Sequence, residues 1–222
     1  MSEIGGAGSV TVVIPCRNEA GSLPGVLAGV PDGYRALVVD NGSLDDTAQI
    51  ALRCGAEVVR EPVPGYGSAV HAGLEASRTE IVCVLDGDGS MDPGELPVLV
   101  QLVREGADLA VGRRRPVRRS GWPLHARVGN ALIAARLRRR HGLPVHDIGA
   151  VRVARRDVLL RLGITDRSSG YPLELLVRAA ASDLRVVERD VTYRRRTAGT
   201  SKVSGSVAGS VRAMRDFWRV IR

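Results

Sequence analysis

The sequence predicts one α/β domain whose mostly parallel β-sheet carries helices on both faces. The chain has 222 residues, 44% of them hydrophobic and 25% charged, which is the composition of an ordinary globular protein with a substantial core. Short apolar runs rich in β-branched residues alternate with segments of helix length, a spacing typical of parallel strands joined by helices. No internal repeat or low-complexity linker divides the chain, so we expect a single domain over 1–222.

The first half alternates strand and helix in a regular order. Each short, mostly apolar run predicts a buried strand, and these runs lie at 10–14, 36–39, 58–59, 81–85 and 108–111. The segments between them predict helices at 19–29, 45–54, 68–76 and 94–103. The second half is less regular, and its patterns predict a basic amphipathic helix at 125–140, an extended segment at 144–153, a helix at 172–181 and a strand or hairpin at 185–193.

The C-terminal stretch carries apolar residues at steps of three and four, which predicts a helix with one apolar face. These residues are Val203, Val207, Val211, Met214, Trp218 and Ile221. Arginines on the same helix fit two alternatives: a helix lying on an anionic membrane surface, or a helix packed on the domain with a solvated basic face. No apolar run approaches bilayer-spanning length, and Met1–Gly8 lacks the pattern of a secretory signal. We therefore expect a cytoplasmic protein, with peripheral contact at the inner face of the membrane as an option.

The charge balance is strongly basic, with a formal net charge of +8 and Lys202 as the only lysine. Arginines concentrate at 113–119, at 136–140 and toward the C-terminus. Nucleic acid, an anionic membrane and phosphorylated small molecules would each suit this charge. One Phe, two Trp and four Tyr leave little aromatic surface for base stacking, so we expect no nucleic-acid partner. Three scattered cysteines predict reduced thiols rather than disulfides or a zinc site.

Polar side chains follow three of the predicted strands at the points where the strands end. The segments are Pro15–Glu19, Asp40–Ser43 and Asp86–Pro93. Because ligands of an open parallel sheet bind beyond the carboxyl ends of its strands, these segments predict a site there. Asp and Asn are also common in turns and helix caps, which is the alternative interpretation.

The Asp86-Gly87-Asp88 triplet is the sharpest of these features. Two carboxylates one residue apart can face the same hard divalent cation, and oxygen ligands suit Mg²⁺ or Mn²⁺ rather than zinc. Such an ion keeps open positions for the oxygens of a nucleotide diphosphate. The residues from Asp86 onward do not match the EF-hand calcium-binding loop, because Met91 and Pro97 stand where that loop needs glycine and glutamate. An acidic turn that caps the next helix stays open as an alternative.

Other short motifs are weaker. The Gly-Tyr-Gly-Ser sequence at 65–68 opens the third predicted helix and offers backbone N–H groups to an anion, although a plain turn fits equally well. No Walker-type sequence and no G-x-S-x-G nucleophile elbow is present, which argues against a P-loop nucleotidase and against acyl-enzyme chemistry. The four histidines show no metal-ligand spacing.

Taken in order, the motifs resemble those of the family 2 glycosyltransferases with the GT-A fold, closest to the polyprenyl (dolichyl) phosphate sugar synthases. The matching pieces are VVIPCRNE at 12–19, VVDNGSLDDT at 38–47, GYGSAVHAG at 65–73, VLDGDGSMDP at 84–93, DIGAVRVARRDV at 147–158 and RTAGTSK at 196–202. The resemblance implies a Rossmann-like GT-A domain with a nucleotide-sugar half over 10–115 and a variable acceptor half over 116–222. Ser90 stands where these synthases commonly have glutamine.

The resemblance also implies roles for single residues. Those expected to bind the nucleotide sugar are Pro15, Arg17, Glu19, Asp40, Gly67, Asp86, Gly87, Asp88 and Arg114. Asp86 and Asp88 match the family's DxD motif, which holds the metal. Arg196 and Lys202 match a basic pair that contacts phosphate of the donor or acceptor.

The implied activity is metal-dependent, inverting transfer of a hexose, glucose or mannose, from a UDP or GDP sugar to a polyprenyl phosphate or another acceptor. A phosphate acceptor is already an anionic nucleophile, whereas a hydroxyl acceptor would need a general base, for which Asp147 or Glu174 is the candidate. Two alternatives stay open. The first is a sugar nucleotidyltransferase, which would require a glycine-rich basic loop after the first strand. The second is a basic nucleic-acid-binding protein, whose binding would need no metal.

Overall fold

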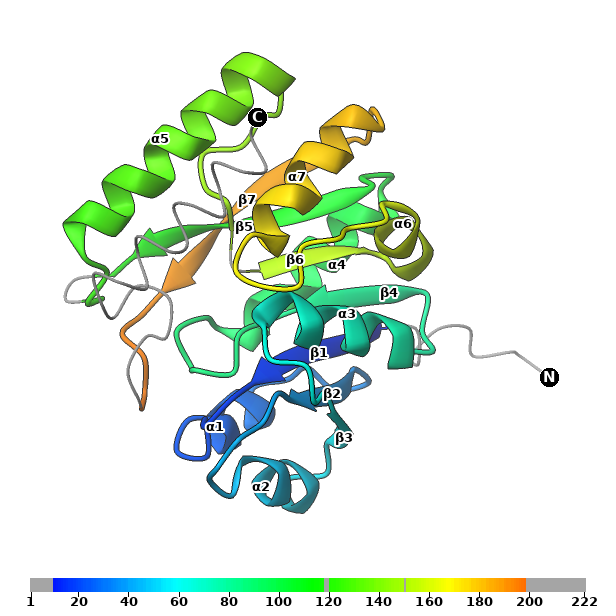
Figure 1. The fold of residues 1–222 in the computed structure, drawn as a ribbon, viewed down its shortest axis with the longest axis vertical. Helices are drawn as coiled ribbons and strands as arrows, with labels where there is room; N and C mark the ends of the chain where they lie inside the picture. Colours follow the sequence, from blue (N-terminus) through cyan, green and yellow to red (C-terminus); the bar gives the residue numbers. More distant parts are fainter. Residues whose placement is uncertain (1–9, 118–119, 150, 199–222) are drawn as a thin grey trace.

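The strands form one sheet in the order β3-β2-β1-β4-β6-β5-β7 (Figure 1). The computed structural model describes residues 10–117, 120–149 and 151–198. The strands are β1 Val10–Cys16, β2 Arg35–Asp40, β3 Glu57–Arg60, β4 Ile81–Val84, β5 Leu109–Pro116, β6 Val151–Arg155 and β7 Val186–Tyr193. All pairs are parallel except those of β6, which runs antiparallel to both β4 and β5. The predicted mostly parallel sheet is thus confirmed.

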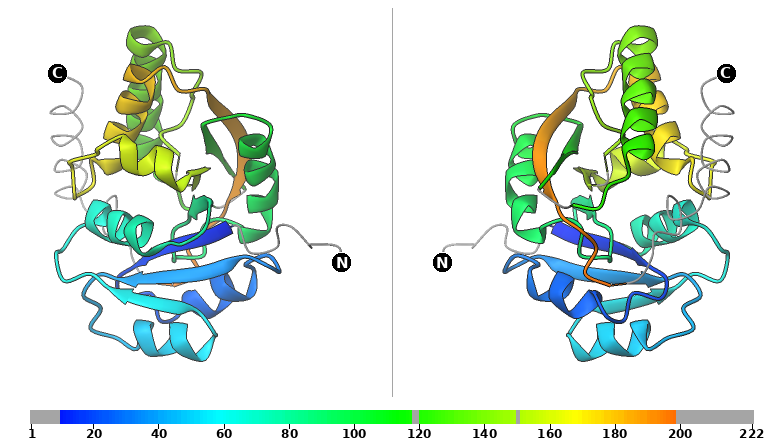
Figure 2. Two further views of the ribbon diagram at one scale, coloured as in Figure 1. Left: turned by 90° about the vertical axis from the view of Figure 1, so that its right-hand side faces the viewer. Right: turned by 90° about the vertical axis from the view of Figure 1, so that its left-hand side faces the viewer.

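Helices cover both faces of this sheet (Figure 2). They are α1 Leu23–Ala28, α2 Thr47–Arg53, α3 Tyr66–Ala76, α4 Leu96–Arg104, α5 Leu124–His141, α6 Arg156–Arg161 and α7 Tyr171–Ala181, and a 3₁₀ helix at Pro93–Glu95 precedes α4. Helix α3 packs on β1 and β2 and contacts α6 and α7, while α4 packs on the opposite face of β5 and β6. Within the part of the chain that the structure describes, no helix has the length and apolarity needed to cross a bilayer.

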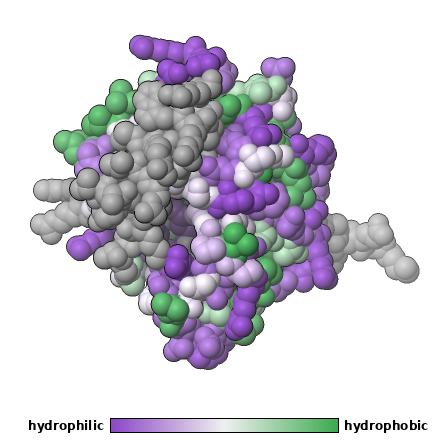
Figure 3. Space-filling model, viewed as in Figure 1, coloured by the Kyte–Doolittle hydropathy of each residue, from purple (hydrophilic) through white to green (hydrophobic). Residues whose placement is uncertain are grey.

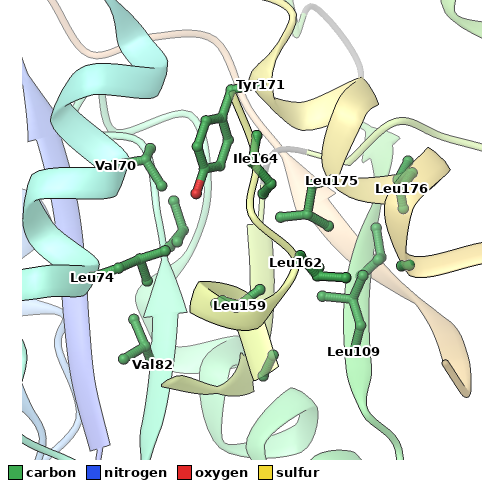
Figure 4. Close-up of a cluster of buried hydrophobic side chains, with 14 of the residues drawn as sticks. Val70, Leu74, Val82, Leu109, Leu159, Leu162, Ile164, Tyr171, Leu175 and Leu176 are labelled. Atoms are coloured by element: carbon green, nitrogen blue, oxygen red, sulfur yellow. The ribbon is translucent and has the colours of Figure 1, made fainter. Parts of the chain in front are cut away.

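The sheet separates two hydrophobic cores because alternate side chains of a strand point to opposite faces. Val13 of β1 belongs to the core under α3 and α7, whereas its neighbour Val12 belongs to the core under α1 and α4. Figure 4 shows the first of these cores, to which α3 contributes Leu74 and α7 contributes Leu175. Gly73 lets α3 approach closely, because a β-carbon there would lie 2.3 Å from a methyl group of Val13.

Several elements differ from the sequence prediction. Helix α1 begins at Leu23 rather than Glu19, because the N–H groups of Ser22 and Leu23 both donate to the carbonyl of Glu19 and form a turn there. Helix α6 was not predicted, since six residues are too few to show a helical period. Strand β7 is one strand along β5 rather than a hairpin. The predicted C-terminal helix lies outside the described residues.

The topology collects the polar strand ends at one edge. Strands β1, β2 and β4 run parallel, so the loops after Cys16, Asp40 and Val84 leave the sheet in the same direction. Strand β5 points the same way as β4, because β6 is antiparallel to both. The sheet edge predicted to hold the site therefore carries all four loops.

Candidate active site

The turn after β4 presents two carboxylates with different surroundings. Gly87 is required between them, because a β-carbon there would lie 2.5 Å from the Sγ of Cys16. The Asp88 side chain is buried, and its Oδ1 accepts a hydrogen bond of 2.8 Å from the backbone N–H of Ser90. Its Oδ2 lies 2.9 Å from the guanidinium of Arg196. No described residue donates a hydrogen bond to the carboxylate of Asp86.

Electrostatics at this turn favour a bound cation. Burial raises the pKa of Asp86 to about 6, and the negative charge of Asp88 contributes in the same direction. The positive charges of Arg152, Arg196 and Arg114 only partly offset this rise. Two carboxylates crowded together with little solvent are stabilised by a cation, so a hard divalent ion fits the donor set.

Phosphate or water oxygens would have to complete the coordination of such an ion. Among the described residues, no group of three or more His, Cys, Asp or Glu side chains could hold a metal ion. Mg²⁺ and Mn²⁺ commonly bind through one or two carboxylates together with phosphates. The pair Asp86 and Asp88 would therefore hold a metal whose remaining ligands are phosphate or water oxygens.

A basic segment at residues 194–197 rests on the same turn. The N–H of Thr197 donates to the carbonyl of Asp88 at 3.1 Å, and the N–H of Arg194 donates to the carbonyl of Ser90 at 2.8 Å. The guanidinium of Arg194 pairs with Asp92 at 3.1 Å. The segment is thus fixed to the turn along its length, which explains how Arg196 reaches Asp88.

The loop after β1 lies against the carboxylate turn. Pro15 is the next-to-last residue of β1, and in the loop that follows Arg17 is exposed while Glu19 is buried. The hydroxyl of Ser22 donates to the carbonyl of Gly87 at 2.8 Å and also lies 3.3 Å from Oε2 of Glu19. The predicted residues Glu19 and Gly87 are therefore connected through a serine that the sequence analysis did not single out.

The loop after β2 joins the loop after β1. Asp40 lies at the end of β2, and its Oδ1 accepts a hydrogen bond of 3.1 Å from the N–H of Ser43. Asn18, in the left-handed region at φ 54°, accepts a hydrogen bond of 2.7 Å from the N–H of Leu44. The buried amide of Asn41 donates to the carbonyl of Glu61 at 2.9 Å. These bonds hold Asp40 at the rim beside the first loop.

Gly67, at the start of α3, has the surroundings of a packed turn rather than of an anion-binding loop, the two interpretations of its motif. Its N–H donates to the carbonyl of Ser168 at 3.1 Å, and the N–H of Ser68 donates to the carbonyl of Arg167 at 2.9 Å. A β-carbon on Gly67 would lie 2.6 Å from the carbonyl oxygen of Asp166. Both N–H groups are thus paired with the chain itself, and close packing of the 166–168 loop accounts for the glycine.

Arg114, near the end of β5, forms a two-pronged ion pair with Asp147. The guanidinium Nε and one terminal nitrogen of Arg114 reach the two carboxylate oxygens at 2.8 and 2.7 Å, and the N–H of Arg114 donates to the same carboxylate. The guanidinium also lies 4.2 Å from the ring centre of Trp122. Although burial acts to raise the pKa of Asp147, the hydrogen bonds and charge of Arg114 hold it below its usual value.

The carboxylate of Glu174, the other candidate for a general base, is likewise engaged in hydrogen bonds within the protein. Its Oε1 accepts hydrogen bonds from the N–H and hydroxyl of Thr165 and from Arg178, and its Oε2 accepts one from the N–H of Asp166. Burial acts to raise the pKa of Glu174, but these donors lower it overall. The geometry gives Asp147 and Glu174 structural tasks, and their catalytic role stays a prediction.

Arg152 of β6 was not predicted as a site residue. Its side chain is buried, donates 3.2 Å to the hydroxyl of Tyr66 and donates to the carbonyl of Gly149. Its charge lowers the pKa of Asp86 against the effect of burial. The only sequence signal was its place within the 147–158 motif, because a single arginine in a strand is usually exposed. Lys202 lies outside the described residues.

Comparison with known proteins finds glycosyltransferases among the relatives of this chain. The model of the family described as Glycosyl transferase family 2 matches residues 11–163. An uncharacterized glycosyltransferase of Mycobacterium tuberculosis is 65% identical over 213 residues, covering 96% of this chain and 98% of its own. The polyprenol monophosphomannose synthase of Mycolicibacterium smegmatis is 33% identical over 216 residues, covering 88% of this chain and 81% of its own.

A solved structure confirms the expected GT-A fold. Glucosyl-3-phosphoglycerate synthase from Mycobacterium tuberculosis, crystallised with Mn²⁺, UDP and glucosyl-3-phosphoglycerate, superposes with a TM-score of 0.75 at 23% identity. The match covers 96% of this chain and 80% of that one. Together the comparisons favour the glycosyltransferase hypothesis over the nucleotidyltransferase and nucleic-acid-binding alternatives.

Proposed function

Because the chain belongs to glycosyl transferase family 2, we propose that it transfers glucose or mannose from a UDP or GDP sugar to a phosphate acceptor, with inversion at the anomeric carbon. The observation that carries the proposal is the pair of crowded carboxylates, Asp86 and Asp88, at the sheet edge. Asp86 accepts no hydrogen bond from a described residue and has a raised pKa, which suits a ligand of Mg²⁺ or Mn²⁺.

The charges around the turn suit the leaving group of sugar transfer. A nucleoside diphosphate gains negative charge as the sugar departs, and a bound divalent ion supplies positive charge against that development. Arg196, next to Asp88, would contact the phosphates, and Lys202 is proposed for the same task. The loops that hold Pro15, Arg17, Glu19 and Asp40 would receive the nucleoside, because they border the turn at the same edge.

We propose a phosphate rather than a hydroxyl acceptor. A phosphate oxygen attacks the anomeric carbon without losing a proton, so transfer needs no side-chain base. This agrees with the engagement of Asp147 by Arg114 and of Glu174 by Thr165 and Asp166. A relative at 33% identity is named a polyprenol monophosphomannose synthase, which supports a polyprenyl phosphate acceptor.

The surface of α5 supports an acceptor presented by a membrane. Leu124, Val128 and Leu132 follow one another at single-turn spacing and are 72%, 52% and 66% exposed. Hydrophobic surface at the upper left of Figure 3 lies over this helix. Exposed arginines flank the stripe at positions 127, 136, 139 and 140. An apolar stripe bordered by cations fits the interface of an anionic bilayer.

Transfer assays test the proposal directly. The purified chain is incubated with radiolabelled UDP-glucose, GDP-glucose or GDP-mannose, with Mn²⁺ or EDTA, and with polyprenyl phosphate in vesicles or 3-phosphoglycerate in solution. We expect label in the lipid fraction only with metal, and a rate of labelling about 10²–10³-fold lower with Asp88→Asn. Label on phosphoglycerate alone would move the acceptor to the soluble phosphates. Absence of both transfer and Mn²⁺-dependent binding for every donor would refute the function.

The membrane contact has its own test. Full-length protein is sedimented with vesicles of neutral or anionic phospholipid, and the variant Leu124→Ser/Val128→Ser/Leu132→Ser is compared with Leu44→Ser/Leu52→Ser, which removes exposed leucines elsewhere. We expect the α5 variant to lose binding to anionic vesicles and the control variant to keep it. Equal binding by both variants, or no binding by the wild type, would contradict a role for α5.

A further inference from the structure

The ion pair between Asp88 and Arg196 occupies a position that a metal would need. Oδ1 of Asp88 accepts from the N–H of Ser90, and Oδ2 lies 2.9 Å from the guanidinium, so both oxygens already have cationic or polar partners. The carboxylate is 5% exposed and Arg196 is 28% exposed. A metal that binds Asp88 through Oδ2 therefore competes with Arg196.

Resting on the proposed function, we propose that Arg196 exchanges partners: it holds Asp88 in the metal-free protein and moves to the diphosphate when metal and nucleotide bind together. The guanidinium thus substitutes for the missing cation. Moving Arg196 away from Asp88 costs less free energy when a phosphate takes the place of the carboxylate as its partner. The metal and the nucleotide therefore bind cooperatively.

The charge balance explains why the two ligands are coupled. Without a metal, Arg196 offsets one of the two negative charges at the DxD turn. With a divalent ion alone, the guanidinium and the ion would lie side by side as like charges in a poorly solvated site, which is unfavourable. A diphosphate removes that conflict, because it supplies negative charge to both cations and accepts bidentate hydrogen bonds from arginine.

The local anchoring permits this exchange without unfolding the segment. The bonds from Thr197 to the carbonyl of Asp88 and from Arg194 to the carbonyl of Ser90 use backbone groups, so they can persist while the Arg196 side chain rotates. Arg196 is partly exposed and has a route through solvent. Arg114, by contrast, is held to Asp147 by two side-chain hydrogen bonds and by contact with Trp122.

Mn²⁺ binding to the protein, measured by electron paramagnetic resonance with and without UDP, tests the exchange. In the wild type we expect UDP to raise Mn²⁺ affinity within the range of about 5–150-fold typical of coupled sites, with an equal effect of Mn²⁺ on UDP. Arg196→Gln should bind Mn²⁺ alone more tightly than the wild type and show a coupling factor near one. Arg194→Gln, whose partner is Asp92, is the matched control and should behave as the wild type.

The outcomes separate this inference from the proposed function. If the wild type binds neither Mn²⁺ nor UDP, the proposed function fails. If the wild type shows coupling and Arg196→Gln keeps both the same coupling and the same affinity for Mn²⁺ alone, only the exchange is refuted. Arg196→Lys, which keeps the charge without the planar fork, is expected to retain part of the coupling, and its loss together with weaker Mn²⁺ binding would also contradict the exchange.

Discussion

Two arginine–carboxylate pairs of this chain differ in how firmly they are held. Asp147 is fixed by two guanidinium contacts, by the backbone N–H groups of Arg114 and Gly149, and by the packing of that arginine on Trp122. Asp88 has one guanidinium contact, from the partly exposed Arg196. The first pair stabilises the fold, whereas we propose that a ligand replaces the second.

The pKa values of the carboxylates show the same division. Asp147 has a lowered pKa, so its ionised form is stabilised by folding, whereas Asp86 has a raised pKa, so its ionised form is destabilised by folding. A carboxylate that the fold already satisfies has little to offer a metal. A carboxylate with a raised pKa has more to gain from a cation, which is why we propose Asp86 as a metal ligand, with Asp88 beside it in the same turn.

The largest effect is expected for Asp147→Asn. Breaking a buried pair leaves the charge of Arg114 uncompensated, which costs about 3–5 kcal/mol of unfolding free energy. Because the pKa of Asp147 is lowered, its contribution is fully present at neutral pH and is lost as the pH falls below about 4. Denaturant melts of both proteins at pH 7 and at about pH 2 should show the difference in unfolding free energy closing, and a constant difference would contradict the assignment.

Asp88→Asn should act on turnover rather than on stability. Removing one charged ligand of the metal site should lower kcat by about 10²–10³, as at comparable electrostatic sites. Arg196 can reach solvent, so the melting temperature should stay close to that of the wild type. Transfer assays and thermal melts on the same preparations check both statements, and a large loss of stability would make Asp88 a structural residue like Asp147.

Glu174→Gln tests whether a third carboxylate belongs with the fixed group. The change removes one acceptor from the donors at Thr165, Asp166 and Arg178, which should cost about 1–3 kcal/mol of stability. Turnover per folded molecule should stay near that of the wild type. A fall of about 10²–10⁴ in kcat at an unchanged fold would instead identify Glu174 as a general base.

An effect of opposite sign is expected for Asp86→Asn in the metal-free protein. Its pKa of about 6 means that wild-type stability falls as the pH rises from about 4 to 6, while Asp86 ionises. The asparagine variant has no carboxylate to ionise, so above pH 6 its unfolding free energy should exceed that of the wild type by about 3 kcal/mol, with no difference near pH 4. Melts in EDTA measure the difference, and destabilisation at pH 7.5 would contradict it.

Much of the fold was predictable because the first half repeats a simple pattern. The apolar runs of β1, β2 and β4 end in polar loops, and parallel pairing brings these loops to one edge whatever the detailed packing. The second half gave weaker signals. The direction of β6 was not predictable, because a short apolar run is the same whichever way the strand runs, and the six residues of α6 carry no period.

The site was predictable in its carboxylates and not in its pairings. Asp86 and Asp88 are one residue apart in the sequence, and this spacing alone predicts that both carboxylates face one cation. Arg114 and Asp147, by contrast, are separated by 33 positions, so only the fold shows that each satisfies the other. The same holds for Gly67, whose neighbours at 166–168 come from a distant loop. A motif identifies functional groups that lie close together in the sequence. Whether such a group is free to bind a ligand depends on its partners from distant parts of the chain, which only the fold shows.

The place of β6 sets a limit on how this protein can be divided. A strand from the later part of the chain lies between β4 and β5, which both come from the earlier part. A fragment that stops after β5 would lack the hydrogen-bonding bridge between two of its own strands. Chimeras with relatives must therefore exchange β6 together with the strands on both sides of it, and recombination at the apparent midpoint would yield two incomplete sheets.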